Sequence, residues 1–260
     1  MQNTDYTALI RTFNSEQTLP ETLASLGRQS LPPREYVFVD SGSVDRTLDI
    51  LPAGSKVHRY ASGKFNYSIA LNEGINLVKT KYTLVISSHT SLLNKEALRA
   101  AIEFLHRRSD VPAAYFVQKL SELIEFDIIT EENFTGFNGV WNTCALYDTH
   151  LLKQRPFRPE VFSAEDQEWS KWLLSSGKYI VRVSGAGMSY NNPLRNRFRK
   201  RLNEELAVAL FVKDEMLRFP YIARVIYRII RPISNNEERL FQAALLYNLL
   251  KLNYSGRKFP

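Results

Sequence analysis

A regular alternation of strand-like and helix-like stretches limits the fold more than any other feature of this chain. Residues 7–10, 36–39 and 82–86 are short apolar runs rich in β-branched and aromatic side chains, a pattern typical of buried strands. Leucines or isoleucines at helical spacing lie between them, in residues 16–29 and 66–78. Such units join by right-handed crossovers, so we expect an α/β fold with a mostly parallel central sheet.

Polar side chains close these predicted strands. Thr12 and Asp40 follow the first two, and His89 follows the strand at 82–86. The carboxyl ends of parallel strands meet at one edge of a sheet, and open α/β sheets bind ligands there. We therefore expect these three side chains on one rim, around a ligand site.

The second half of the chain shows a less regular pattern. Residues 113–117 and 179–183 have the pattern of strands, and residues 165–176 that of a helix. Between them, residues 133–148 mix aromatics, glycine and polar residues, as in the loop-rich wall of a binding site. From residue 203 onward nearly the whole chain has a helical pattern.

Positive charge is concentrated near the carboxyl end. The formal net charge is +7; residues 1–192 carry 20 Lys and Arg against 21 Asp and Glu, whereas residues 193–260 carry 14 against 6. This split predicts a main domain over residues 1–192 and a basic helical extension over residues 193–260. A nearly neutral main domain argues against a nucleic-acid partner.

Cys144 is the only cysteine, which excludes an internal disulfide and a zinc site built from several thiolates. No apolar run reaches the ~18 residues of a membrane span. The first residues lack the apolar core of a signal peptide. Together these features predict a cytoplasmic protein.

Four blocks of the sequence carry side chains suited to chemistry, and their order and spacing matter more than any one of them. They are Thr-Phe-Asn at 12–14, Asp-Ser-Gly-Ser-Val-Asp at 40–45, the stretch 65–74 followed by Ser88 and His89, and Ala-Glu-Asp-Gln-Glu-Trp at 164–169. With these blocks, the chain from about residue 6 to residue 190 resembles the family 2 glycosyltransferases. The resemblance implies the GT-A fold, a Rossmann-like and mostly parallel sheet flanked by helices.

The resemblance also implies a nucleotide-diphosphate sugar held across the sheet rim. The donor-binding candidates that it indicates are Thr12, Asn14, Asp40, Lys64, Asn72, Ser88 and His89. An ionised carboxylate such as that of Asp40 only accepts hydrogen bonds, which suits a nucleobase N–H or ribose hydroxyls. Purely structural alternatives stay open: Asp40 as a helix cap, Lys64 as a solvated lysine, and Asn72 as a helix-packing residue.

Glu165 and Asp166 match the acidic pair of the family, in which the aspartate acts as general base. Inverting transfer needs a carboxylate that takes the proton of the attacking hydroxyl. The alternative is that the two acids only favour the start of the following helix. Asn138, Trp141 and Trp169 fall where the family lines its acceptor pocket, although aromatic side chains are more often part of a core.

The chain departs from the family at the fourth strand. There the family usually carries Asp-x-Asp, which holds Mg²⁺ or Mn²⁺ on the diphosphate, whereas this chain has Ser88, His89 and Thr90. No acid lies between Glu73 and Glu96. We therefore expect a divalent cation with His89 as its candidate ligand, more readily Mn²⁺ than Mg²⁺. Alternatively, His89 donates directly to phosphate or packs at the strand end.

The carboxyl-terminal part has two notable features. Residues 195–201 contain five cations in seven positions, and an isoleucine-rich stripe with arginines on the other face covers residues 222–233. The cations could neutralise a diphosphate or, with the stripe, contact an anionic membrane surface. The alternatives are a solvated basic helix and docking of the stripe on the main domain.

These patterns lead to one main expectation and three rivals, of which the third is an adaptor that binds nucleic acid or a membrane through its carboxyl-terminal part. We expect an inverting glycosyltransferase that moves a sugar to the hydroxyl of a saccharide or of a lipid-linked saccharide. We expect it to act in bacterial surface polysaccharide synthesis, in the cytoplasm or at the inner face of the membrane. The first rival is a sugar nucleotidyltransferase, but residues 11–14 lack the glycine- and basic-rich loop that it needs. The second is a non-catalytic nucleotide-sugar-binding module, which the missing Asp-x-Asp favours and the retained Glu165 and Asp166 oppose.

Overall fold

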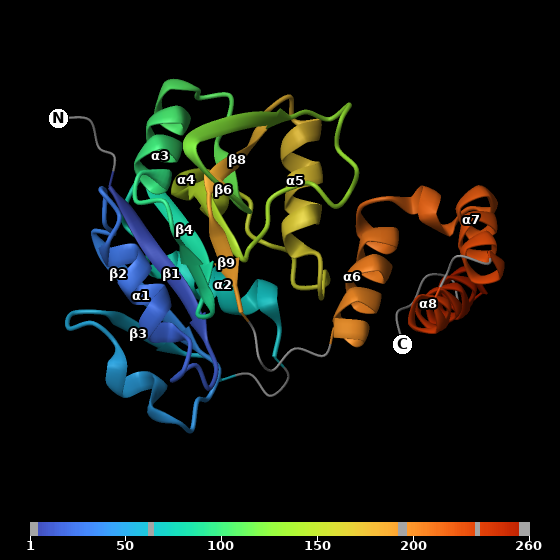
Figure 1. The fold of residues 1–260 in the computed structure, drawn as a ribbon, viewed down its shortest axis with the longest axis horizontal. Helices are drawn as coiled ribbons and strands as arrows, with labels where there is room; N and C mark the ends of the chain where they lie inside the picture. Colours follow the sequence, from blue (N-terminus) through green and yellow to red (C-terminus); the bar gives the residue numbers. More distant parts are fainter. Residues whose placement is uncertain (1–4, 62–64, 192–196, 232–234, 255–260) are drawn as a thin grey trace.

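The structure is a computed structural model that describes residues 5–61, 65–191, 197–231 and 235–254. A seven-stranded sheet forms its centre and helices cover both faces (Figure 1). The strands of this sheet are β1 (Tyr6–Thr12), β2 (Glu35–Asp40), β3 (Lys56–Arg59), β4 (Tyr82–Ser87), β6 (Ala113–Ile129), β7 (Cys144–Asp148) and β8 (Ile180–Ala186). A second sheet pairs β5 (Thr90–Leu92) with β9 (Met188–Tyr190).

The helices alternate with the strands as expected. They are α1 (Leu19–Gly27), α2 (Tyr67–Leu77), α3 (Ala97–Arg107), α4 (Thr149–Gln154), α5 (Glu165–Ser175), α6 (Arg197–Phe211), α7 (Phe219–Ile230) and α8 (Asn236–Tyr254), with 3₁₀ turns η1 (Arg46–Ile50) and η2 (Asp214–Leu217). The side chain of Asn66 accepts the Ile69 N–H at 3.1 Å and so fixes the start of α2. Asp148 does the same for α4 through Leu151 N–H.

The sheet order is β3-β2-β1-β4-β7-β6-β8, and β1 pairs in parallel with both β2 and β4. Strands β2 and β3 are also parallel, which confirms the mostly parallel sheet. The exception is β7, which runs antiparallel to both its neighbours. The expectation of a loop-rich stretch over residues 133–148 was wrong at its end, since residues 144–148 form β7. Residues 144–148, Cys-Ala-Leu-Tyr-Asp, contain no β-branched residue, so they lack the composition by which the equally buried strand at 82–86 was recognised.

The strand expected at residues 113–117 is the first part of the much longer β6. Its first half runs alongside β8 with Ala113 opposite Ile180, and the chain then returns so that Ile129 also lies opposite Ile180. The polar and exposed residues of this second half hide the strand from a search for buried apolar runs.

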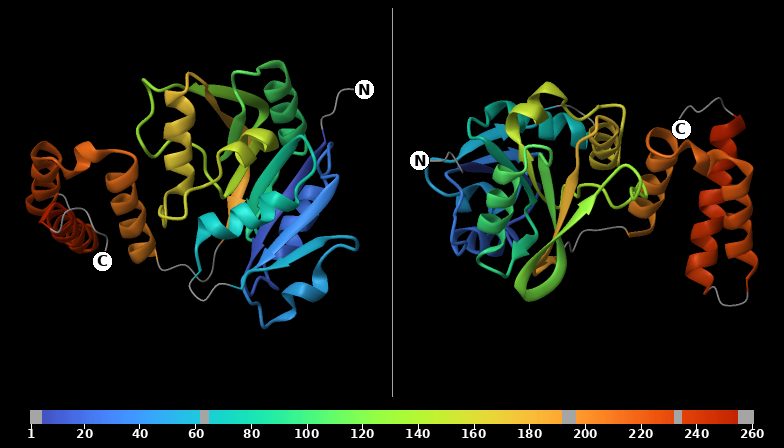
Figure 2. Two further views of the ribbon diagram at one scale, coloured as in Figure 1. Left: turned by 180° about the vertical axis from the view of Figure 1, so that it is seen from behind. Right: turned by 90° about the horizontal axis from the view of Figure 1, so that it is seen from above.

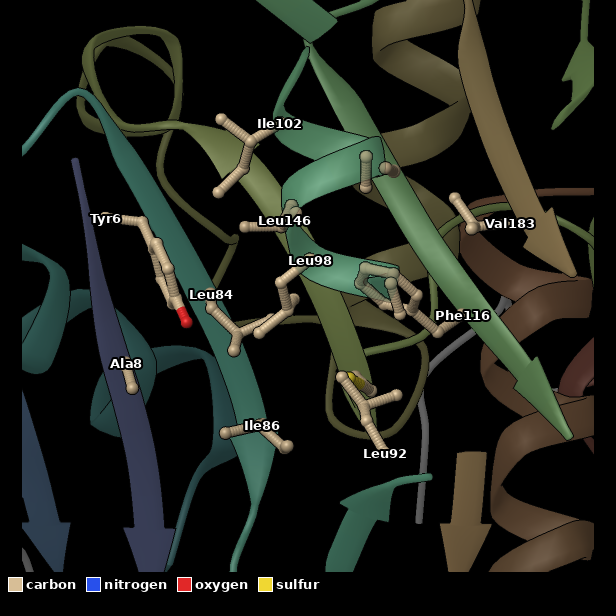
Figure 3. Packing of buried hydrophobic residues seen from close by; sticks show 14 of the residues in the cluster. Tyr6, Ala8, Leu84, Ile86, Leu92, Leu98, Ile102, Phe116, Leu146 and Val183 are labelled. Atoms are coloured by element: carbon tan, nitrogen blue, oxygen red, sulfur yellow. The ribbon is translucent and has the colours of Figure 1, made fainter. Parts of the chain in front are cut away.

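Two apolar clusters hold the helices to the sheet. One lies beneath α1 and α3, where Leu84, Leu98, Phe116 and Leu146 interdigitate (Figure 3). The other lies beneath α2, α4 and α5 and includes Trp169. Side chains of this size are costly to truncate in a core, by about 3–5 kcal/mol for a phenylalanine or tryptophan, so the sheet gives the rim a rigid base.

A third cluster joins the main body to the carboxyl-terminal helices. Val161 and Ala164, which precede α5, are buried together with residues of α6, η2, α7 and α8. Lys171 of α5 also donates to the carbonyl of Val212 at 2.6 Å. Helix α6 therefore packs beside α5, while α7 and α8 lie farther from the sheet (Figures 1 and 2). In the described part of the chain, no helix combines the length and apolarity needed to cross a membrane.

Candidate active site

A cavity of about 710 Å³ opens at the carboxyl ends of β1 and β4. The starts of α2 and α5, the segment before β7 and one face of α6 form its walls. Its lining includes Arg11, Tyr67, Ser87, His89, Gln118, Trp141, Asn142, Glu165, Asp166, Arg199 and Lys200. Of the three side chains expected on the rim, His89 lines this cavity, whereas Thr12 and Asp40 are not among its lining residues. Helix α6 of the carboxyl-terminal part also contributes to the wall.

The acidic pair, Glu165 and Asp166, lies at the start of α5 and is held by the segment that precedes β7. The backbone N–H of Asn142 donates to Asp166 Oδ2 at 3.0 Å, and the Asn142 amide donates to Glu165 Oε1 at 3.1 Å. Tyr147 in turn donates its hydroxyl to Asn142 Oδ1 at 2.6 Å. One asparagine therefore fixes both carboxyl groups, and a buried tyrosine fixes that asparagine.

Close packing brings this segment against α5. A Cβ on Gly139 would lie 2.5 Å from the side chain of Ser170, so only glycine allows this approach. The Ser170 hydroxyl accepts the Val140 N–H at 2.8 Å, and Gln167 Oε1 accepts the Gly139 N–H at 3.0 Å. These contacts set the distance between the cavity wall and the acidic pair.

The electrostatics of the pair suit a general base. Burial, and then the neighbouring Glu165 carboxylate, raise the pKa of Asp166 to about 7, against the hydrogen bonds from Asn142 and Gln167 that lower it. Its side chain still keeps part of its surface open to the cavity. A carboxyl group that titrates near neutral pH in a cleft is well placed to take a proton from a substrate.

The end of β4 presents hydroxyl and imidazole groups in place of carboxylates. The Ser88 hydroxyl lies 2.7 Å from that of Ser15 and faces the first loop. His89 lines the cavity and stacks edge-on against Tyr190 at 4.8 Å between ring centres. No group of three His, Cys, Asp or Glu side chains that could hold a metal ion occurs among the described residues. The described side chains at this position therefore do not fit a divalent cation held by the protein.

The other end of the rim is built from two loops bonded to each other. Asp40 is buried and accepts four hydrogen bonds, from the Thr12 hydroxyl, the Gly42 N–H, and both the N–H and the hydroxyl of Ser43. Asn14 has a positive φ of 46° and its side chain accepts the Val44 N–H at 2.9 Å. In this arrangement Asp40 and Asn14 hold the two loops after β1 and β2 together.

The remaining predicted residues lie in different places. Asn72 bonds the backbone N–H and carbonyl of Phe157 and does not line the cavity, and Trp169 is fully buried in the second cluster. Asn138 holds a turn by bonding Thr135 and the carbonyl of Asn133, whereas Trp141 lines the cavity. Lys64 lies outside the described residues.

Sequence reasoning missed several cavity residues. Arg11 carries a signal that could have revealed it, because it is a charged residue inside a buried strand. Asn142 lies within residues 133–148, which were expected to form the wall of a binding site, but nothing in the sequence shows that it contacts both acids. Arg199 and Lys200 belong to the run of cations at 195–201 that the sequence offered for a diphosphate, and they do line the cavity; Tyr67 lies in the stretch 65–74 but was not itself named as a site residue.

Comparisons with known proteins agree with this geometry. Residues 7–146, more than half of the chain, match the family described as Glycosyl transferase family 2. A Methanococcus voltae protein named dolichyl N-acetyl-alpha-D-glucosaminyl phosphate 3-beta-D-2,3-diacetamido-2,3-dideoxy-beta-D-glucuronosyltransferase is 24% identical over 241 residues, which cover 82% of this chain and 74% of that protein.

TarS of Staphylococcus aureus, a poly(ribitol-phosphate) beta-N-acetylglucosaminyltransferase, is 27% identical over 68% of this chain, and the match spans only 34% of TarS.

Two solved structures share the fold across 98% of the chain. TarS residues 1–349 in complex with UDP-GlcNAc superpose with a TM-score of 0.62 at 16% identity, covering 93% of that chain. The mannosyltransferase PcManGT from Pyrobaculum calidifontis, in complex with GDP-Man and Mn²⁺, gives 0.59 at 14% identity over 76% of that chain. The fold and the family that the four blocks indicate are thereby confirmed, and the chain belongs to glycosyl transferase family 2, the glycosyltransferases with a GT-A fold.

Proposed function

We propose that this glycosyltransferase moves a sugar from a nucleotide-diphosphate sugar to a saccharide hydroxyl with inversion at the anomeric carbon. Asp166 is the general base: it takes the hydroxyl proton as the oxygen attacks the anomeric carbon and the bond to the diphosphate breaks. The observation that carries the proposal is the raised pKa of Asp166 in a cavity that reaches the end of β4. Glu165 supports this role, because its charge helps to raise that pKa.

The donor would span both ends of the rim. Thr12, Asn14 and Asp40 form and order the loops for the base and ribose, and Ser88 and His89 lie where the diphosphate would pass. Lys64, which lies outside the described residues, and Asn72, which lies within α2 and bonds Phe157, remain donor candidates by resemblance. The UDP and UDP-GlcNAc complexes of TarS, which has the same fold, support a nucleotide-diphosphate sugar as the donor.

The acceptor would enter over Trp141, whose ring forms part of the cavity wall. Asn138 and Trp169 would act from behind this wall, by holding its turn and its core. The names of the Methanococcus and Staphylococcus relatives describe transfer to a dolichyl-linked sugar and to poly(ribitol phosphate). These names support a saccharide or lipid-linked saccharide acceptor and a role in surface polysaccharide synthesis.

A divalent cation enters this proposal only together with the donor. The family commonly uses one, and PcManGT was solved with Mn²⁺. Because the described side chains form no cation cluster, most ligands would have to come from the diphosphate, with His89 as the candidate from the chain. Measuring transfer in Mn²⁺, in Mg²⁺ and in a chelator tests this point.

We keep the two-part organisation as part of the proposal, with residues 1–192 as the catalytic domain and 193–260 as a helical extension. Its helix α7 buries Ile222 and Val225 but exposes Phe219, Ile226 and Ile230, beside arginines. Such a face suits an anionic membrane at the cytoplasmic side.

Co-sedimentation of the full chain with anionic vesicles tests this membrane contact. Binding should fall at high salt and in the double variant Ile226→Glu with Ile230→Glu. Charging two exposed leucines of β6 in Leu120→Glu with Leu123→Glu is the control and should leave binding intact. Absence of binding at low salt would refute the membrane contact.

A screen of nucleotide sugars tests the proposed reaction. Wild-type chain should release nucleoside diphosphate from at least one of them, faster when a saccharide acceptor is added. The product should have the opposite anomeric configuration to the donor, which nuclear magnetic resonance reports. Release by wild type and Asp166→Asn at equal rates would contradict the assignment of the base.

A further inference from the structure

Arg11 occupies a central position on the rim. It is the penultimate residue of β1, with Val39 of β2 and Ser87 of β4 as its register neighbours. Because strand side chains alternate, Arg11 shares the face of Leu9, which packs in the cluster beneath α2 and α5. Its side chain therefore points into the cavity that Asp166 also lines.

The bonding of Arg11 is incomplete within the described part of the chain. Its Nε and Nη1 atoms are buried and have no hydrogen-bond partner there. The ion pairs among the described residues do not include Arg11. Its guanidinium carbon instead lies 4.8 Å from the ring centre of Tyr67. Arg11 as a whole is half-buried, but two buried guanidinium nitrogens without a partner are costly to keep, so their presence beside a cavity calls for an anionic ligand.

The position of Arg11 indicates which anion would bind. Ser87, its register neighbour, leads into Ser88 and His89, where related enzymes place the acids that hold a cation on the diphosphate. Here that cation cluster is missing among the described residues, yet the leaving diphosphate still needs positive charge. A guanidinium presents its N–H groups as a fork that matches two phosphate oxygens.

We propose that Arg11 binds an oxyanion of the donor, the β-phosphate, and supplies charge that a bound metal ion supplies in related enzymes. This inference rests on the proposed function. Arg199 and Lys200 of α6 line the same cavity and add positive charge on its other side. The same fork would also fit a carboxylate on the donor sugar, so the test separates these two sources.

The test measures nucleotide binding by calorimetry in a chelator, using the full chain. The probes are UDP, GDP, CDP, ADP and dTDP, and then the nucleoside monophosphate of whichever diphosphate binds wild type most tightly. Arg11→Met should weaken diphosphate binding about 10- to 100-fold and change monophosphate binding much less. Arg182→Met is the matched control, since Arg182 pairs with Asp127 outside the cavity.

Two further measurements test whether Arg11 has only a structural role. Without ligand, Arg11→Met should keep or raise the melting temperature, because it removes a buried cation with open donors. Mn²⁺ should restore part of the lost diphosphate affinity, since the ion can supply the missing charge. Arg11→Lys, which keeps the charge but not the fork, should fall between wild type and Arg11→Met.

The outcomes separate the two proposals. Wild-type binding of a diphosphate that Arg11→Met leaves unchanged overturns this inference and leaves the proposed function standing. A loss confined to the uronic-acid form of the nucleotide sugar, absent for its neutral counterpart, overturns the β-phosphate in favour of a sugar carboxylate. If wild type binds none of the diphosphates, the inference and the proposed function both fail.

Discussion

The two ends of the rim differ in how their polar groups are bonded. At the nucleotide end, all four hydrogen bonds that the Asp40 carboxylate can hold come from the chain itself, and the side chain of Asn14 joins the two loops. At the sugar end, Arg11 keeps buried donors open and Asp166 holds a raised pKa. At the first end the polar groups are hydrogen-bonded before a ligand binds. At the second end the buried donors of Arg11 lack an acceptor until a ligand supplies one.

This difference indicates where binding and chemistry take place. Preformed loops recognise a ligand at little entropic cost, because few groups must be ordered on binding. Unbalanced charges cost stability but stabilise a transition state in which charge develops. Substitutions at the nucleotide end should therefore reduce stability and affinity together, and substitutions at the sugar end should reduce rate or anion binding without unfolding the protein.

The largest expected effect comes from Asp166→Asn at the sugar end. Transfer should fall by about 10²- to 10⁴-fold, because the amide cannot take the acceptor proton. Nucleotide affinity and melting temperature should stay close to wild type. Steady-state kinetics and calorimetry check this, with Asp127→Asn on the exposed face of β6 as the control. A loss of rate matched by unfolding would show that the carboxylate is structural.

At the nucleotide end, Asp40→Ala should lower both stability and nucleotide affinity. Leaving the Gly42 and Ser43 donors unsatisfied costs about 1–3 kcal/mol. Thermal unfolding and nucleoside diphosphate titration measure the two effects. If the folded variant binds nucleoside diphosphate as tightly as wild type, the order of these loops does not determine binding. The proposed difference between the two ends of the rim would then be wrong.

A smaller effect is expected at Asn14, whose φ of 46° lies in the left-handed region. Asn14→Ala should destabilise the chain by about 1–2 kcal/mol, since alanine resists this conformation and loses the bond to Val44. Asn14→Gly loses the same bond but tolerates the backbone, so it should cost less. Denaturant titration compares the two variants. Equal losses would mean that the side-chain bond alone matters.

The sequence predicted the parts of this structure that depend on local pattern. Strand runs such as residues 7–10 and helix spacing such as residues 66–78 recur as β1 and α2, because burial of one face imposes the period. The strand β7 was not predicted, because Cys-Ala-Leu-Tyr-Asp contains no β-branched residue to mark it as a buried strand. The second half of the long β6 was not predicted, because much of it is polar and exposed.

The site was predictable only in part, for a similar reason. The positions of Asp40 and Asp166 follow from strand and helix ends, which local pattern determines. That the oxygens of Asp40 are fully used by its own loop, or that Asn142 holds Asp166, depends on contacts between segments far apart in the chain. The cations of α6 were visible in the sequence, but that this helix lies against the cavity is a tertiary contact.

The most direct test of the central claim is the pH dependence of transfer. A base acts only when unprotonated, and burial beside Glu165 raises the pKa of Asp166 to about 7. The rate at limiting donor should therefore fall about tenfold per pH unit below that value and level off above it. A rate that stays constant from pH 5.5 to 8.5 in the folded wild-type chain would contradict the assignment of Asp166 as the general base.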